Sequence, residues 1–122
     1  MEVSPAAMEA YIQTARARKL ARQQRLEQRR TQAWAVAQHA AVVLKEEFGA
    51  TRVGVFGSLL HPDLFYERSD VDLAVWGLDE RLYHRAHARL LSLDPTLEVD
   101  LIEVEHARPA LQAVIEREGV IL

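Results

Sequence analysis

The sequence predicts one small domain of α/β (α+β) class, in which helices alternate with short strands. Its 122 residues, 49% of them hydrophobic, are enough to form a single core. Short runs rich in Val, bounded by Gly, Ser or Asp, are typical of strands. Longer segments between these runs have apolar residues at spacings of three and four, which are typical of helices.

Residues 6–48 contain neither Pro nor Gly and predict a long N-terminal helix, either continuous or broken into two helices near residues 30–32. Ser4 and Pro5 suit its start, and Gly49 suits its end. The first half is polar, so we expect it to project or to pack on another chain. The second half should pack on the core through an apolar stripe formed by Trp34, Ala37, Ala41, Leu44 and Phe48.

Charge divides the chain at residue 32. Residues 1–32 contain seven Lys or Arg and three Glu, a net +4, whereas residues 33–122 contain eight Lys or Arg and fifteen Asp or Glu, a net −7. We therefore predict a basic helical extension over 1–32 and the main domain over 33–122. The basic charge favours an acidic protein partner or a homodimer contact first, and a merely solvated helix second. Nucleic-acid binding ranks third, because no aromatic residues interleave for base stacking.

The elements of the main domain follow one another at short intervals. "RVGVFGS" predicts a strand that ends in a turn at Gly57, and "LLHPDLFYER" predicts a helical turn or loop. "DVDLAVW" predicts a strand, and residues 79–93 predict a helix capped by Asp79. "LEVDLIEVE" alternates as a strand with one buried face does. "ARPALQAVIERE" predicts a helix, and "VIL" predicts a closing edge strand.

The composition excludes several classes of protein. Because the chain has no cysteine, it cannot form disulfides, use thiolate catalysis or hold zinc through Cys ligands. The start of the sequence has no apolar signal segment, and no apolar run approaches the roughly 20 residues of a membrane helix. We therefore expect a cytoplasmic protein with no membrane partner.

Three aspartates form the candidate catalytic group. Asp70 and Asp72 are separated by one residue, so in a strand they point to the same face. Asp100 lies in a second predicted strand, and the three carboxylates can converge if these strands are neighbours. Close carboxylates repel one another and raise their pKa values, which a divalent cation relieves. Such oxygen-rich sites suit Mg²⁺ or Mn²⁺, and two ions roughly 3.5–4 Å apart can clamp a phosphoryl displacement.

Gly57 and Ser58 are the candidate phosphate-binding residues. Gly lets the backbone approach a phosphate closely, and the turn's N–H groups and the Ser hydroxyl can donate to phosphate oxygens. The motif is not a Walker loop, because it lacks the Gly-Lys-Ser/Thr sequence. Ser69 has two interpretations: it contacts the nucleotide phosphate, or it only orients the loop before Asp70.

The combined pattern "VFGS…SDVDLAV…EVDLIEV" resembles the nucleotidyltransferase superfamily that includes DNA polymerase β. More narrowly, it resembles the minimal nucleotidyltransferases often encoded beside HEPN-domain proteins. The resemblance covers roughly residues 48–122 and implies a small mixed-sheet nucleotidyltransferase core within residues 33–122. The long basic helix is not part of that pattern.

The resemblance implies a role for each site residue. Gly57 and Ser58 would hold the triphosphate of ATP, and Asp70 and Asp72 would ligate two Mg²⁺ ions, with Mn²⁺ as the alternative. Asp100 would ligate the catalytic ion and help to deprotonate an attacking hydroxyl. AMP would pass from ATP to that hydroxyl with release of pyrophosphate. In the narrower group the acceptor is a tyrosine of a partner HEPN toxin, so the chain would be an antitoxin.

Two other functions remain open at this point. The chain could be a non-catalytic binding module that inhibits or scaffolds a helical partner. It could also be a nucleotidyltransferase whose acceptor is a small molecule, such as an aminoglycoside, or an RNA end. The presence of Ser58 and all three aspartates favours catalysis, and the short chain leaves little room for a dedicated acceptor pocket.

Overall fold

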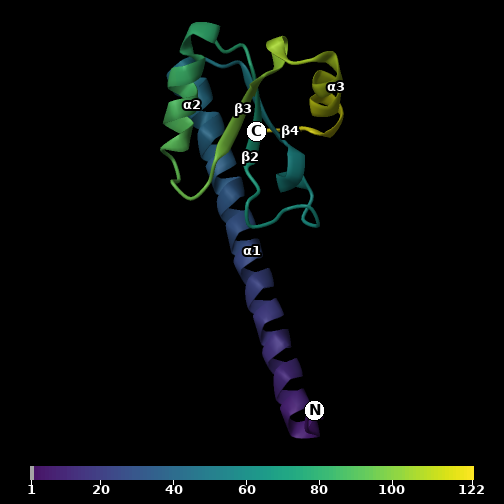
Figure 1. Ribbon diagram of the computed structural model, residues 1–122. Coiled ribbons are helices and arrows are strands. Elements are labelled where there is room, and N and C mark those ends of the chain that lie inside the picture. The colour runs from purple at the N-terminus through teal and green to yellow at the C-terminus, as the bar shows by residue number, and fades with distance from the viewer. Residues whose placement is uncertain (1) are drawn as a thin grey trace.

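Four strands form one mixed sheet in the order β3-β2-β1-β4 (Figure 1). In the computed structural model, which describes residues 2–122, these are β1 (Arg52–Phe56), β2 (Val71–Trp76), β3 (Val99–Glu103) and β4 (Val120–Ile121). β1 pairs antiparallel with both β2 and β4, and β2 pairs parallel with β3. The predicted α/β class and the predicted strands are confirmed.

The part of the chain that the structure describes also contains three α-helices and three short 3-10 helices. They are α1 (Pro5–Phe48), η1 (Gly57–Leu60), η2 (Glu80–Leu82), α2 (Tyr83–Leu91), η3 (Val104–His106) and α3 (Pro109–Glu118). The helix predicted over 79–93 begins as η2, because the Asp79 side chain accepts the Arg81 N–H at 3.0 Å and tightens the first turn. The strand predicted over 97–105 ends at Glu103, where η3 begins.

Helix α1 is one continuous helix of 44 residues, so the alternative of a break near residues 30–32 is wrong. It starts as predicted, since the Ser4 hydroxyl accepts the Ala7 N–H at 3.1 Å. It ends at Gly49, which adopts φ +73° and donates its N–H to the Leu44 carbonyl. Despite the length of α1, no helix in the described part of the chain is apolar enough to cross a membrane.

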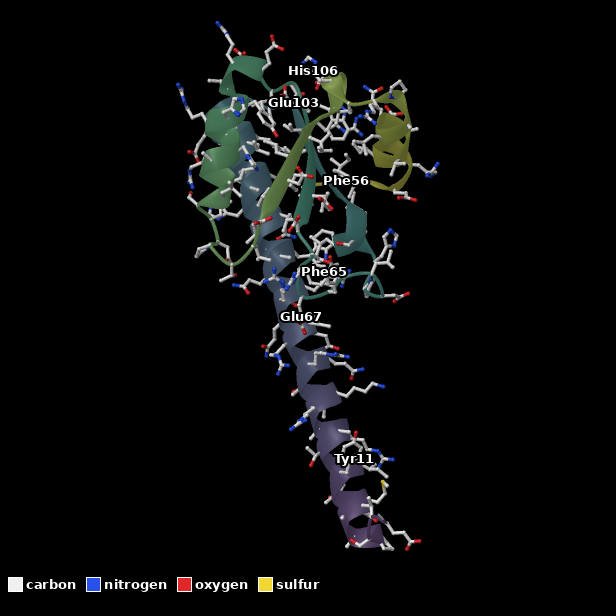
Figure 2. All side chains as sticks on the ribbon, viewed as in Figure 1. Tyr11, Phe56, Phe65, Glu67, Glu103 and His106 are labelled. Carbon is white, nitrogen blue, oxygen red and sulfur yellow. The ribbon has the colours of Figure 1, made fainter. Side chains whose placement is uncertain are left out.

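The two halves of α1 have different surroundings. Residues 2–20 are all exposed, and Figure 1 shows this half projecting away from the body. Tyr11 lies on the projecting half, whereas Phe56 lies within the body (Figure 2). The predicted apolar stripe is confirmed in the second half: Ala37, Ala41 and Leu44 are buried, and Trp34 and Phe48 pack at the margin of the core.

The sheet separates a large core from a small one. One face packs on α1 and α2 through residues that alternate along the strands: Val53, Val55, Val71, Leu73, Val75, Val99 and Leu101. On the other face, Phe56 and Ala74 pack with Val104 and with Ile115 of α3. Figure 1 accordingly shows α2 and α3 on opposite sides of the sheet. The second face is only partly covered, and the candidate site lies on it.

Candidate active site

The site begins at the turn between β1 and η1. Gly57 has φ +77°, a conformation that residues with a Cβ rarely adopt. In addition, the carboxylate of Asp72 occupies the space that a Cβ on residue 57 would fill, so a larger residue there would force this side chain to move. This close approach follows from the ladder, in which Phe56 is the Cα partner of Asp72. The predicted turn and the predicted carboxylate are therefore in direct contact.

The three aspartates lie where β2 and β3 begin. Asp72 and Asp100 are Cα partners in the parallel ladder, so their side chains point to the same face. Asp70 lies just before β2 rather than inside it, because the first residue of the strand is Val71, whose N–H donates to the Glu98 carbonyl at 2.9 Å. The condition set by the sequence, that the two strands be neighbours, is fulfilled.

The electrostatic environment of Asp72 differs from that of an isolated carboxylate. Partial burial, and after it the charges of Asp100 and Asp70, raise the pKa of Asp72 to about 6. A carboxylate that is difficult to ionise beside two others is a site where an added positive charge is favourable. Asp72 is therefore the electrostatic centre of the group.

The donor chemistry of this group fits a hard divalent cation, since carboxylate oxygens are the ligands that Mg²⁺ and Mn²⁺ prefer. Within residues 2–122, however, no three His, Asp or Glu side chains are placed closely enough to hold a metal ion. Asp70, Asp72 and Asp100 thus lie near one another without forming a coordination shell.

The two serines of the site differ. Ser58 lies in η1 and is partly exposed. Ser69 is only 4% exposed, and its hydroxyl accepts the Tyr66 N–H at 3.0 Å. Its own N–H donates to the Tyr66 carbonyl at 3.1 Å. Ser69 therefore closes the loop that leads into Asp70, in agreement with the second interpretation drawn from the sequence. Its contact with nucleotide stays a prediction.

Helix α2 holds β3 on both sides of Asp100. The Tyr83 hydroxyl donates to the Leu101 carbonyl at 2.7 Å, and His87 Nε2 lies 2.7 Å from the Val99 carbonyl. Burial, together with the charges of Asp100 and Glu103, raises the pKa of Tyr83. The sequence analysis did not identify these two residues, although their spacing of four on one helix face is a signal that both meet the same neighbour.

Arg30 is a third residue that the sequence analysis missed. It belongs to α1, and its Nε and Nη2 donate to the Leu59 carbonyl in η1 at 3.1 and 2.9 Å. The contact joins residues 29 positions apart, and nothing in the composition of the basic segment distinguishes Arg30 from its neighbours.

A family comparison gives these features their context. The family model described as polymerase beta, nucleotidyltransferase, matches residues 38–122, a range that contains all four strands and every predicted site residue. The chain belongs to this nucleotidyltransferase family. The resemblance to the nucleotidyltransferase superfamily inferred from the sequence is thereby confirmed, and the roles of Gly57 and the three aspartates stay predictions.

Solved structures share the fold of this nucleotidyltransferase. A chain of a toxin–antitoxin with AMP-PNP has 22% identity and a TM-score of 0.57, over 68% of this chain and 69% of that one. A chain of a mutant toxin–antitoxin MntA-HpeT has 20% identity and a TM-score of 0.54, over 65% of each chain. A chain of another MntA-HpeT mutant has 23% identity and a TM-score of 0.53, over 66% and 65%.

The matched region thus spans about two thirds of the length of each solved chain. At these identities the likeness concerns the fold. A search among curated proteins finds no match.

Proposed function

We propose that this nucleotidyltransferase transfers a nucleoside monophosphate, AMP from ATP, to a hydroxyl of a partner protein and acts as the antitoxin of a toxin–antitoxin pair. The observation that carries the proposal is the contact between the Gly57 turn and Asp72, with Asp100 as the next residue across the ladder. A phosphate-binding turn and a carboxylate group in direct contact are the two components that phosphoryl transfer needs in one place.

In this proposal each residue has one role. The backbone N–H groups of the turn and the Ser58 hydroxyl donate to the triphosphate, which orients the α-phosphorus toward the carboxylates. Asp70, Asp72 and Asp100 would hold Mg²⁺, or Mn²⁺, which would neutralise charge on the phosphate oxygens. Asp100 accepts the proton of the attacking hydroxyl. The hydroxyl oxygen forms a bond to the α-phosphorus, the bond to the β-phosphate oxygen breaks, and pyrophosphate leaves.

The acceptor is proposed to be a tyrosine of a HEPN-type toxin. Support comes from the resemblance in the sequence to minimal nucleotidyltransferases and from the toxin–antitoxin identity of the solved structures with this fold.

The test is to incubate the purified protein with α-labelled ATP and Mg²⁺, with and without its toxin partner. The double variant Asp70→Asn/Asp72→Asn should lose label transfer by more than a hundredfold, in line with the loss of a principal electrostatic contribution. The matched control is Asp63→Asn, which removes an exposed carboxylate from the preceding loop and should retain full transfer.

Three other outcomes would change the proposal. Label on RNA or on a small molecule would keep the chemistry and replace the acceptor. Nucleotide binding without transfer to any acceptor would show that the proposed acceptor is wrong. Neither binding nor transfer would favour a non-catalytic binding module.

A further inference from the structure

Arg30 connects the basic segment of α1 to the candidate nucleotide-binding turn. Two of its guanidinium nitrogens, Nε and Nη2, donate to a single acceptor, the Leu59 carbonyl, at 3.1 and 2.9 Å. Leu59 is the third residue of η1, the four-residue turn that starts at Gly57. Because the guanidinium is planar and rigid, two of its donors on one oxygen fix the direction of that carbonyl.

The direction of this carbonyl matters for the whole turn. The peptide group is planar, so orienting the Leu59 carbonyl also orients the Leu60 N–H on the opposite side of the peptide bond. The Leu59 side chain is fully buried, which anchors the position of the turn but not its rotation about that anchor. Another bond within the turn runs from the His61 N–H to the Ser58 carbonyl at 3.0 Å. Arg30 supplies the contact from outside that fixes the rotation.

Neighbouring cations of the basic segment do not share this contact. Arg29 Nη1 donates at 3.2 Å to the Thr96 carbonyl, in the loop before β3. Arg25 is exposed and, among the contacts of residues 2–122, makes no side-chain hydrogen bond. The seven cations of residues 1–32 are therefore not one uniform surface, and Arg30 is the one that reaches the turn.

We propose that Arg30 is a positioning residue that holds the Gly57–Ser58 turn in the orientation in which it receives the triphosphate. The inference rests on the proposed function, because it assigns Arg30 to that same site. It changes the interpretation of the basic segment, whose last cations serve the domain rather than a partner. The functional unit then extends into residues 1–32, across the boundary expected from charge alone.

The experiment compares Arg30→Ala and Arg30→Lys with Arg25→Ala, which removes the same charge at an exposed position. We expect Arg30→Ala to raise the KM for ATP about tenfold while kcat changes much less, since the turn still forms but binds the triphosphate poorly. Arg30→Lys, which retains the charge but has a single nitrogen donor, should recover part of the affinity. Arg25→Ala should match the wild type.

A readout independent of activity separates the two proposals. The backbone amide resonances of Gly57 and Ser58 should shift in Arg30→Lys and stay in place in Arg25→Ala, at unchanged melting temperature. If KM and these resonances are the same in Arg30→Lys and Arg25→Ala, the inference is overturned, even if Arg30→Ala fails to fold. If the wild type neither binds nor transfers ATP, the proposed function fails, and the amide shifts still show whether Arg30 orients the turn.

Discussion

The two faces of β2 contribute different properties to the protein. On one face Val71, Leu73 and Val75 are fully buried against α1 and α2. On the other, partial burial, and after it the charges of Asp100 and Asp70, raise the pKa of Asp72. Burial of the apolar face stabilises the fold, whereas burial of Asp72 opposes folding whenever the group is charged. A strand of six residues can do both because successive side chains point to opposite faces.

The largest expected effect lies on the apolar face. Leu73→Ala should lower the free energy of unfolding by about 2–5 kcal/mol, because it removes a fully buried side chain and leaves a cavity. The measurement is denaturation in urea. Leu20→Ala is the control, since Leu20 is 56% exposed on the projecting half of α1, and it should change stability by less than about 0.5 kcal/mol. Equal losses in both variants would contradict the division between core and projection.

The next effect lies where the carboxylate face meets the turn. Gly57→Ala should cost about 1–2 kcal/mol for its positive φ alone, and more because the new Cβ meets the Asp72 carboxylate. Gly49→Ala is a close control, since Gly49 has φ +73° with no atom within 4 Å of the added Cβ. Its loss should be smaller, and the difference measures the contact with Asp72.

A double-mutant cycle tests this explanation. Combining Gly57→Ala with Asp72→Ala should recover the part of the loss that comes from the carboxylate and leave the part that comes from φ. If the two losses simply add, the close approach of Gly57 and Asp72 has no energetic consequence.

The contrast between the faces also shows how far a sequence can be interpreted without coordinates. Period-2 alternation is local, so the strands and the direction of Asp72 relative to Leu73 could be predicted from neighbouring residues. The proximity of Asp72 to Asp100 could be stated only as a condition, because strand order depends on the whole chain. The Gly57 turn was predicted, but its direct contact with Asp72 depends on the β1–β2 register.

The partners in the contacts that hold the site in place could not be predicted from the sequence. Arg30 and Leu59 are 29 positions apart, and Tyr83 and Leu101 are 18 apart. In both contacts a side chain donates to a backbone carbonyl, a group that every residue has, so no complementary pair of residues is visible in the sequence. The 3-10 form of η1 is likewise invisible, because "GSLL" is compatible with several turns.

A smaller effect, of opposite sign to the first, is expected at Asp72. Asp72→Asn should increase the free energy of unfolding of the metal-free protein at pH 7, because it removes a carboxylate whose charged form destabilises the folded state. Solvent screening limits the increase to on the order of 1 kcal/mol. Transfer activity should be lost in the same variant. Asp79→Asn is the control of opposite sign. Hydrogen bonds from Arg81 lower the pKa of Asp79, so removing this carboxylate should destabilise the folded protein slightly.

The smallest effect is the net pH dependence of the metal-free wild type. Because the pKa of Asp72 is raised from 3.8 to about 6, the folded chain keeps this proton longer than the unfolded chain does. Stability from this group is therefore complete below about pH 4 and falls as the pH rises to about 6. Asp79 and Asp94, whose pKa values are lowered by hydrogen bonds, act in the opposite direction and lose their contribution as the pH falls below about 4.

Because these contributions have opposite signs, the stability of the wild type changes little with pH. The measurement therefore has to compare the stability of the wild type with that of a variant. Urea denaturation of wild type and Asp72→Asn at several values between pH 4 and 7 should give curves that converge near pH 4 and separate toward pH 6, with the wild type less stable. Parallel curves would mean that Asp72 ionises as easily in the folded chain as in the unfolded one. The carboxylate face would then not lower the free energy of unfolding, and the two faces of β2 would differ only in their polarity.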